Sequence, residues 1–513
     1  MGVGRAGWRE WGGLALLALP TMLLGLDVTA LYLVVPTLAA DLHPTATETL
    51  WIMDAYGFFI AGLLVTMGTL GDRVGRRRLL MIGVAAFGVA SVAAALAPSS
   101  AWLIAARALL GVAGATLMPS TLSLISNMFT DARQRALAFG VWVTMFALGM
   151  AAGPIAGGAL VASFWWGAVF LVAVPIAVVV LVCAPLLLPE FRTGGGLPDL
   201  LSVGLSLTAM LPLVYAIKHV AADGFDGEAL VAALIAVCST VAFVRRQLRL
   251  DEPLLDMKLF TASRAFSAAL GVLLIGLVGF GGMMYLVTQY LQLVEGLPAT
   301  TAGLWMGPPA LAMLVGALGA PLVASRVSPG VVMGGTLALS LAGYALLATA
   351  GADNTPSVVA GFAFVYLGLG VIAALGTDIV VGAAPPEKSG SAAALSETVQ
   401  ELGIAAGVAL LGSLTTAVYR AAVEVPPGLA PDAAEAYRDS LSRASSQVSA
   451  AALDNARAAF TSGLTTAAIT AGVAIAAAAL VCMTVLRHVR PLGEAVPEAE
   501  PITSAHGSGG NDR

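Results

Sequence analysis

Charged residues are scarce in this sequence. Of its 513 residues, 11% are Asp, Glu, Lys or Arg, whereas 58% are hydrophobic. Soluble globular proteins carry about 25% charged residues, so water cannot cover most of the surface of this chain. The composition therefore excludes an ordinary soluble enzyme and gives no reason to expect a nucleic acid as partner.

Cysteine and histidine are also rare. Cys183, Cys238 and Cys482 lie in apolar runs without a CxxC spacing, which argues against a disulfide framework or a zinc site. The four histidines lie in loops, near helix ends or in the tail. Because the sequence holds no nucleophile–base arrangement and no phosphate-binding loop, we expect no metal, no cofactor and no enzymatic activity.

Long apolar runs are what this sequence has in abundance. A helix that crosses a bilayer needs about 20 largely apolar residues, and runs of that length recur along the chain. They predict an all-α polytopic membrane protein with fourteen transmembrane helices, at 12–36, 49–70, 79–97, 101–125, 136–160, 164–188, 200–219, 228–244, 265–294, 301–323, 329–350, 356–380, 390–418 and 461–486.

The basic residues indicate the orientation of these helices. With the N-terminus placed in the cytoplasm, nineteen of the 25 Lys and Arg residues fall on the inner side and one, Arg107, lies within a span. Five fall outside: Lys218, Arg420, Arg438, Arg443 and Arg457. Cytoplasmic loops of membrane proteins carry an excess of Lys and Arg, so both termini are predicted to be cytoplasmic.

Two landmarks recur at the same offset along the chain. Pro44 and Trp51 flank the start of the second span as Pro298 and Trp305 flank the start of the tenth. Gly149, Gly153 and Gly158 in the fifth span are matched by Gly403, Gly407 and Gly412 in the thirteenth. The pattern predicts two copies of a six-helix unit, an arrangement typical of carriers that rock one half against the other.

The repeat divides the chain into four predicted parts. Residues 1–188 form the first six-helix bundle, 189–264 hold two inserted helices with their linkers, 265–486 form the second bundle, and 487–513 form a cytoplasmic tail. The second bundle includes a long outer loop, 419–460, whose Ala-rich and polar sequence indicates partial helix. Residues 491–513 have no apolar face and are predicted to be disordered.

Several motifs lie in or beside the predicted spans. The loop after the second span holds Gly71, Asp72, Arg73, Gly75 and Arg76. The acid within this basic turn indicates a specific ion pair. Arg77 and Arg78 are interpreted as charges that set the topology. The other motifs are Asp27 in the first span, Trp51-Ile-Met-Asp54-Ala-Tyr56 in the second, Arg107-Ala-Leu-Leu-Gly111 in the fourth, Gly149-Met-Ala-Ala-Gly153-Pro154-Ile-Ala-Gly157-Gly158 in the fifth, and Ser396-Glu397-Thr-Val-Gln-Glu401 in the thirteenth.

In this order, from residue 12 to residue 486, these motifs resemble those of the major facilitator superfamily, and within it the fourteen-helix drug:proton antiporters of the EmrB/QacA grouping. The resemblance implies a major facilitator fold of two six-helix bundles with two inserted central helices. It also implies export of quaternary ammonium compounds and dyes, and a part in conformational gating for the loop after the second span, the helix-5 glycines with Pro154, and Asp378. Two features depart from the pattern: Gly167 stands where an Arg is usual, and 301–323 carries no acid, which leaves doubly charged substrates in doubt.

Ionisable side chains within the predicted spans are expensive to insert and usually serve a transport pathway. We predict Asp27 as the main proton-coupling carboxylate, tuned by Arg107, with Asp54, Glu397 and Glu401 completing an acidic cavity. Burial disfavours the charged form of a carboxyl group, so a proton and an organic cation would compete for the same carboxylates. A shallow interfacial position remains open for Asp54, and a structural role for Glu397 and Asp378.

The cavity wall is predicted to be aromatic and rich in methionine, so that flat cations stack on its rings. The candidates are Tyr32, Trp51, Tyr56, Trp142, Phe146, Tyr285, Trp305 and Met306. The alternative for each is packing or an interfacial belt. Gly149, Gly153, Gly157 and Gly158, with Pro154, are predicted to let the fifth helix approach the other bundle closely.

The sequence therefore predicts a proton-driven exporter of lipophilic, mostly cationic drugs, dyes and antiseptics, monomeric, in a bacterial cytoplasmic membrane. It needs no cofactor because the proton gradient drives it. An exporter of one endogenous metabolite or antibiotic remains an alternative. A polytopic membrane enzyme and a membrane sensor are disfavoured, because the spans hold no catalytic cluster and the chain holds no additional folded soluble domain.

Overall fold

The structure is a computed structural model of the chain. It describes residues 6–489 apart from 193–198, 251–252, 254–259, 261–262, 352–353, 384–388 and 449–452. Within these residues the secondary structure is entirely helical. The tail predicted at 491–513 lies outside the described residues, as do most of the linker residues around 255.

Fourteen helical segments are long and apolar enough to cross a membrane, which confirms the number predicted from the sequence. They are Trp8–Leu33, Ala46–Val74, Arg76–Ala95, Ser100–Met128, Leu137–Ser163, Ala168–Leu187, Leu200–Ala221, Gly227–Gln247, Arg264–Val294, Ala299–Ala324, Pro329–Leu347, Thr355–Gly382, Leu395–Ala422 and Asp454–His488. Most begin and end within about four residues of the predicted span. The larger differences are at the start of the last two, which begin at Leu395 and Asp454 where the sequence predicted 390 and 461.

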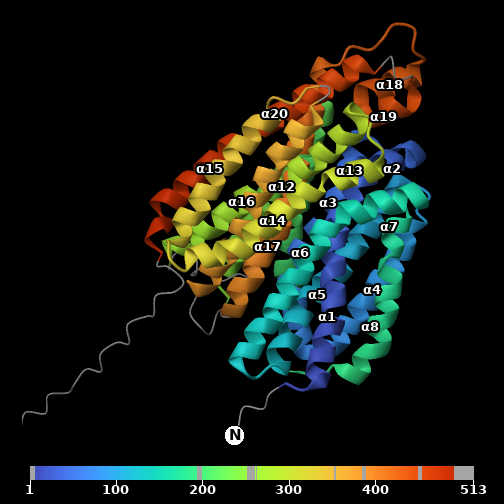
Figure 1. Ribbon diagram of the computed structural model, residues 1–513. Coiled ribbons are helices and arrows are strands. Elements are labelled where there is room, and N and C mark those ends of the chain that lie inside the picture. The colour runs from blue at the N-terminus through green and yellow to red at the C-terminus, as the bar shows by residue number, and fades with distance from the viewer. Residues whose placement is uncertain are drawn as a thin grey trace, which may run out of the picture.

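The helices that form these segments and their connections carry the labels of Figure 1. They are α1 (Trp8–Ala30), α2 (Val35–Leu42), α3 (Ala46–Val74), α4 (Arg76–Ala95), α5 (Ser100–Met128), α6 (Ala132–Ser163), α7 (Ala168–Leu171), α8 (Ala173–Leu187), α9 (Leu200–Asp223), α10 (Gly227–Gln247), α12 (Arg264–Gln289), α13 (Ala299–Trp305), α14 (Gly307–Ala324), α15 (Pro329–Leu347), α16 (Thr355–Gly382), α17 (Ser389–Ala422), α18 (Pro431–Asp439), α19 (Leu441–Gln447) and α20 (Asp454–Thr484). Short turns at Leu31–Leu33, Tyr290–Val294 and Leu486–His488 extend three of them.

The first predicted span, 12–36, is interrupted before its end. A 3-10 turn at Leu31–Leu33 follows α1, and a separate short helix, α2, then begins at Val35. Pro36 occupies the first turn of α2, where a missing backbone N–H costs nothing and the fixed φ favours a helix start. The chain therefore turns before α3 begins at Ala46, where Thr45 and Glu48 form a capping box.

Two six-helix bundles stand side by side (Figure 1). The first contains α1, α3, α4, α5, α6 and α7–α8, and the second contains α12, α13–α14, α15, α16, α17 and α20. Two seams join them, because α3 packs against α17 while α6 packs against α13 and α14. "Outer end" below means the end where α3 begins and α18 and α19 lie, which the charge distribution predicts to face outside.

Large apolar side chains are exposed on the outward faces of several helices. Ile82 and Val89 of α4, Val182 of α8 and Leu318 of α14 are all more than half exposed. Exposed apolar patches of this extent mark an interaction surface, and together with the lengths of the helices they fit contact with lipid tails. The polar and charged groups that are buried lie instead inside the bundles and along the seams.

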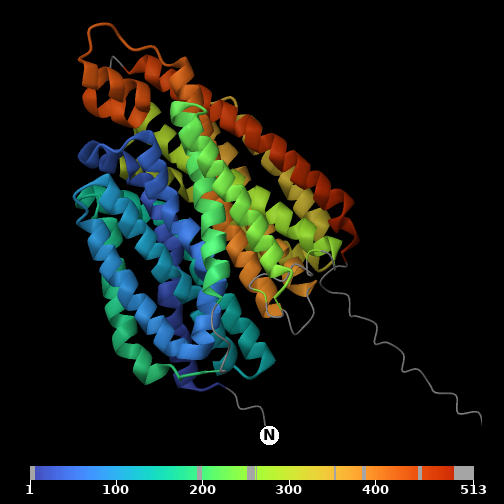
Figure 2. The same ribbon diagram turned by 180° about the vertical axis from the view of Figure 1, so that it is seen from behind.

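The inserted helices α9 and α10 pack against each other on one side of the molecule, over the seam between α3 and α17 (Figure 2). Phe58 of α3, Val214 of α9, and Ala405 and Ala409 of α17 form an apolar cluster there. At the other end of the pair, Asp199 caps α9 and lies 2.9 Å from Arg246 of α10. The hydrogen-bonded Arg246 guanidinium lowers the pKa of Asp199 to about 2, so this clamp stays ionised across the physiological range.

Candidate functional site

Arg107 of α5 lies in the interior of the first bundle, and only 2% of this side chain is exposed. Its Nη1 donates to Asp27 Oδ2 of α1 over 2.7 Å, and its Nε donates to the carbonyl oxygen of Ile52 in α3 over 3.1 Å. The guanidinium also lies 4.6 Å from the centre of the Tyr56 ring. Arg107, predicted to tune Asp27, is thus in direct contact with it, and three helices hold the pair in place.

Asp54 of α3 is fully buried, and its partner is Lys218 of α9. Lys218 Nζ lies 2.9 Å from Asp54 Oδ1 and 3.9 Å from the centre of the Trp51 ring. Neither side chain is exposed, so Asp54 lies in the interior of the protein and not on its surface. The sequence analysis counts Lys218 among the outer charges, at the end of the predicted span 200–219, and does not anticipate this pair; α9 continues to Asp223 and carries Lys218 on its buried face.

Glu397 and Glu401 lie one helical turn apart on α17, in the second bundle. Glu401 is buried and Glu397 is partly buried. Within the part of the chain that the structure describes, neither carboxylate has a hydrogen bond or an ion pair. The backbone of Glu401 lies beside Gly57 of α3, so α17 brings its acids to the seam with the first bundle, the bundle that holds Asp27 and Asp54.

The charge balance of this cluster decides what it can bind. Four carboxyl groups, those of Asp27, Asp54, Glu397 and Glu401, face two internal cations, Arg107 and Lys218. Asp27 and Asp54 each hold one of these cations, whereas the two glutamates are left without a basic partner among the described residues. Such a cluster attracts protons and organic cations rather than anions.

The aromatic candidates fall into two groups. Tyr56 is buried beside Arg107, and its hydroxyl has no partner within the described chain. Trp51 covers the Lys218 ammonium, so it is more than an interfacial belt residue. Trp142 is instead held as packing, because its indole N–H donates to Thr121 Oγ1 of α5 over 3.0 Å.

The remaining wall candidates are less enclosed or lie elsewhere. Phe146 and Trp305 are half-buried, whereas Tyr32 and Met306 are buried. Tyr285 lines a small cavity near the outer end with Thr49 and Gln289.

The glycines of α6 contact two different partners. A side chain at Gly149, Gly153 or Gly157 would collide with the backbone of α1, within the same bundle. A side chain at Gly158 would collide with Ala299 of α13, and Gly303 of α13 similarly abuts Pro154. The prediction that this stripe faces the other bundle is therefore confirmed for Gly158 and wrong for the other three.

The second copy of the repeat packs in the same way. Gly403 and Gly407 of α17 lie against α12, and Gly412 lies against Leu50 of α3 in the first bundle. In each half, two glycines of the motif approach the first helix of their own bundle and the third contacts the opposite bundle. The 254-residue offset read from the sequence thus corresponds to equivalent packing positions.

The loop between α3 and α4 is held by specific contacts. Gly75 has a φ of +115°, a conformation that favours glycine. Asp72 Oδ1 lies 2.6 Å from Arg76 Nη2, as the acid in this turn predicts, while Arg73 is exposed. Arg77 lies 3.6 Å from Glu190, after α8, so the interpretation of this side chain as only topogenic is wrong.

The other gating candidate, Asp378, is exposed on α16, and no described contact supports or excludes a gating role. The three cysteines are free. Within the described residues no group of three or more His, Cys, Asp or Glu side chains could hold a metal ion.

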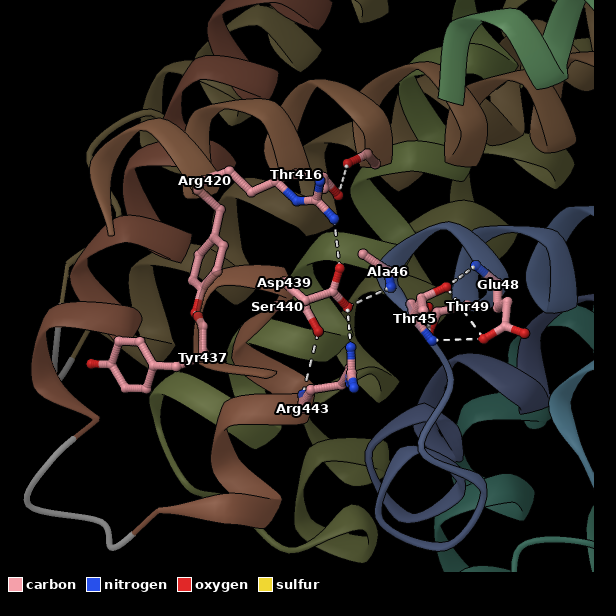
Figure 3. A network of polar contacts seen from close by, with 12 residues as sticks. Thr45, Ala46, Glu48, Thr49, Thr416, Arg420, Tyr437, Asp439, Ser440 and Arg443 are labelled. Carbon is pink, nitrogen blue, oxygen red and sulfur yellow. Dashed lines mark hydrogen bonds and ion pairs between the residues drawn. The ribbon is translucent and has the colours of Figure 1, made fainter. Parts of the chain in front are cut away.

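The outer end of the molecule is closed by a polar network around Asp439, at the end of α18 (Figure 3). Its carboxylate lies 2.6 Å from Arg420 of α17 and 3.4 Å from Arg443 of α19. It also accepts a 2.8 Å hydrogen bond from the backbone N–H of Ala46, at the start of α3. Asp439 thus ties the outer loop of the second bundle to the first bundle.

We expect the Asp439→Ala variant to open more readily at the outer end, because it loses the acceptor for Ala46 and the charge that Arg420 and Arg443 share. Spin labels at Ala101 and Thr349, both exposed and in opposite bundles, would report this in a cysteine-free background. Their distance distribution should shift to longer values. Asp432→Ala, an exposed acid of the same helix α18, is the matched control, and equal distributions for both variants would contradict the role of Asp439.

The fold and this site define a membrane transporter of the major facilitator type. The chain matches the Major Facilitator Superfamily over residues 17–408 and belongs to that family, in its fourteen-helix drug:proton antiporter branch. It is a multi-pass membrane protein and not an enzyme.

Two curated relatives match this chain over most of their length. The chain is 44% identical to the multidrug efflux pump LfrA of Mycolicibacterium smegmatis, over 92% of this chain and 95% of the relative. It is 35% identical to the methyl viologen resistance protein SmvA of Salmonella typhimurium, over 82% and 86%. A solved bacterial homologue of the human lysosomal transporter Spinster shares the fold, with a TM-score of 0.66 at 16% identity, covering 93% of this chain and 97% of that one.

Proposed function

We propose that this protein exports lipophilic, mostly cationic drugs, dyes and antiseptics from the cytoplasm or the inner leaflet in exchange for protons. The observation that carries the proposal is the buried cluster of four carboxyl groups with only two internal cations, contributed by α1, α3 and α17 from both bundles. The similarity to a multidrug efflux pump and to a methyl viologen resistance protein supports the substrate class.

The proposed exchange uses competition for the same carboxylates. Glu401 is buried without a basic partner, so the proton-bound form is the one that a low-dielectric site favours. An organic cation that enters the cavity favours the ionised form, and a proton is released. Each ligand excludes the other, and the proton gradient contributes about 2.3 kcal/mol per charge per 100 mV of membrane potential.

Asp27 and Arg107 have a related part in this proposal. Their 2.7 Å ion pair is lost if Asp27 takes up a proton, which releases the guanidinium to the Tyr56 ring and the Ile52 carbonyl. Asp27 belongs to α1, Ile52 and Tyr56 belong to α3, and Arg107 belongs to α5, so protonation of Asp27 changes the balance of contacts that holds these three helices together. The protein acts as a monomer in this scheme, since one chain supplies both bundles.

The proposed orientation places both termini in the cytoplasm of a bacterial cell. It is supported by the excess of Lys and Arg on that side. The outer end is then the face that the Asp439 network closes. A carrier in this arrangement would take up its substrate from the inner side.

The experiment that tests the proposal is transport by the purified protein in liposomes. Under an imposed pH gradient we expect accumulation of ethidium, which a protonophore abolishes and empty liposomes do not show. An equal rate with the protonophore would contradict proton coupling. Transport of a single metabolite but of none among several dyes and antiseptics would favour the alternative of a dedicated exporter.

A further inference from the structure

Lys218 carries a positive charge from the inserted helix α9 into the acidic cluster. A buried lysine is costly in a membrane protein and is usually retained for a functional reason. Its Nζ contacts Asp54 at 2.9 Å and lies 3.9 Å above the centre of the Trp51 ring. A carboxylate and an aromatic face are the groups that recognise organic cations.

The alternative is that this ion pair merely fastens α9 to α3. The packing around it argues against that role. Phe58, Val214 and Ala405 already form an apolar contact between α3, α9 and α17, and Leu63 of α3 packs against Val203 of α9 near the other end. Because buried ion pairs add little stability over apolar side chains of similar volume, the seam does not need a charged pair to hold α9.

One carboxylate oxygen of Asp54 has no partner within the described chain. Its Oδ1 contacts Lys218, whereas its Oδ2 is buried and has no hydrogen-bond partner within the described chain. An unpartnered carboxylate oxygen in such surroundings costs free energy. The position can therefore accept a second cationic or hydrogen-bonding group, or a cation in place of the lysine.

A displaced lysine would have other acids nearby. A cavity of about 790 Å³ lies between α9 and α10, with Trp51 and Tyr215 in its wall together with Asp226 and Glu228. Tyr215 precedes Lys218 by three residues, so the two side chains lie on the same face of α9. Glu228 accepts a hydrogen bond from the Tyr215 hydroxyl and Asp226 pairs with His219, so an ammonium group that left Asp54 would join a site where two acids already hold polar partners.

We propose that Lys218 is a specificity-determining residue: it occupies the Asp54–Trp51 subsite as a tethered cation and so restricts export to substrates with a single positive charge. With Asp27 held by Arg107 and Asp54 held by Lys218, the glutamates of α17 are the acids left for the substrate. A dication needs a further carboxylate, which becomes available only when Lys218 leaves Asp54. This inference rests on the proposed export of organic cations.

The test compares a dication with a monocation in the same liposomes. Methyl viologen and ethidium are the probes, under one imposed pH gradient. In the Lys218→Met variant we expect the ratio of methyl viologen transport to ethidium transport to rise at least about fivefold, because a buried carboxylate at contact distance interacts strongly with a cation. Lys218→Arg keeps the charge and should keep the wild-type ratio.

Asp54 supplies the matched control. The Asp54→Asn/Lys218→Met double variant lacks the carboxylate that the single variant exposes, so its ratio should return to the wild-type value. An unchanged ratio in Lys218→Met would overturn the inference. Loss of both substrates in Lys218→Met, with both restored in the double variant, would also overturn it, because that pattern indicates only a structural ion pair.

Binding measurements separate this inference from the proposed function. Quenching of tryptophan fluorescence in the detergent-purified protein reports affinity for both probes without requiring transport. If the wild type transports no cation, the proposed function fails. The ratio of the affinities for methyl viologen and ethidium, compared between Lys218→Met and the wild type, still tests whether Lys218 excludes dications. Lys218→Gln, whose amide can donate to Asp54, takes the place of the Met variant if the latter does not fold.

Discussion

Replacing Asp27 by Asn is expected to reduce proton-driven export of ethidium by about 100-fold, the scale of a lost proton-transfer group. Asn has nearly the same size and keeps one acceptor oxygen for Arg107, but it cannot bind and release a proton. It also leaves the Arg107 guanidinium, 2% exposed, without a negative partner. The measurement is dye efflux in everted membrane vesicles energised by a pH gradient.

Two checks make this result specific. Asp432→Asn removes an acid of the exposed helix α18 and should transport like the wild type. Size-exclusion profiles of the fluorescently tagged variants would exclude loss of folding as the cause. Undiminished proton-driven transport by the Asp27→Asn variant would remove Asp27 from the coupling mechanism and leave Glu401 as its main candidate.

The Gly153→Leu variant is expected to lose both thermal stability and transport. An added side chain at Gly153 would meet Thr29 Oγ1 and the backbone of α1 at Ala30, and a backbone cannot be repacked as a side chain can. Overpacking a tight interior typically costs about 1–3 kcal/mol. Melting of the detergent-purified protein, followed by size-exclusion chromatography, gives the stability, and ethidium efflux gives the activity.

Gly140 offers a control on the same helix. Nothing lies within 4 Å of a side chain built there, so Gly140→Leu should melt and transport like the wild type. Gly153→Ala should fall between the two, because its single added carbon already collides with α1. Equal melting temperatures for Gly153→Leu and Gly140→Leu would show that α1 and α6 are not held by this contact.

The fold could be read from the sequence because a membrane imposes a simple rule on each helix. About 20 apolar residues in a row suffice to identify a span, and all fourteen spans were found in this way. The pairing of Asp27 with Arg107 could also be predicted, because both charges lie deep in spans where they must find a partner. The repeat offset identified equivalent helices without any structural information.

The sequence misplaced features that depend on which neighbour a helix face meets. Lys218 was counted among the outer charges because the predicted span 200–219 ends beside it, although α9 continues for another turn. A signal was present: Asp54 needed a cation, and Lys218 lies at a comparable distance from the outer end. The partners of Gly149 and Gly153 could not be predicted, since glycine permits close approach to any helix.

The network around Asp439 was missed for a different reason. The 419–460 segment has no long apolar run, and its sequence therefore indicates little beyond partial helix. The partners of Asp439 are Arg420, Arg443 and the backbone of Ala46, and the last of these lies almost 400 residues away in the sequence. Contacts of this kind are set by how the two bundles meet and leave no local pattern.

The position of α9 and α10 makes the two faces of this protein unequal toward the lipid. The inserted helices cover the seam of α3 with α17, because α9 packs against both. The seam of α6 with α13 and α14 has no such cover in the described chain. A lipophilic molecule dissolved among the acyl chains would therefore contact the bundle seam directly on one side of the protein and meet α9 and α10 first on the other. Lateral entry of a substrate from the bilayer would therefore be expected along the seam of α6 with α13 and α14.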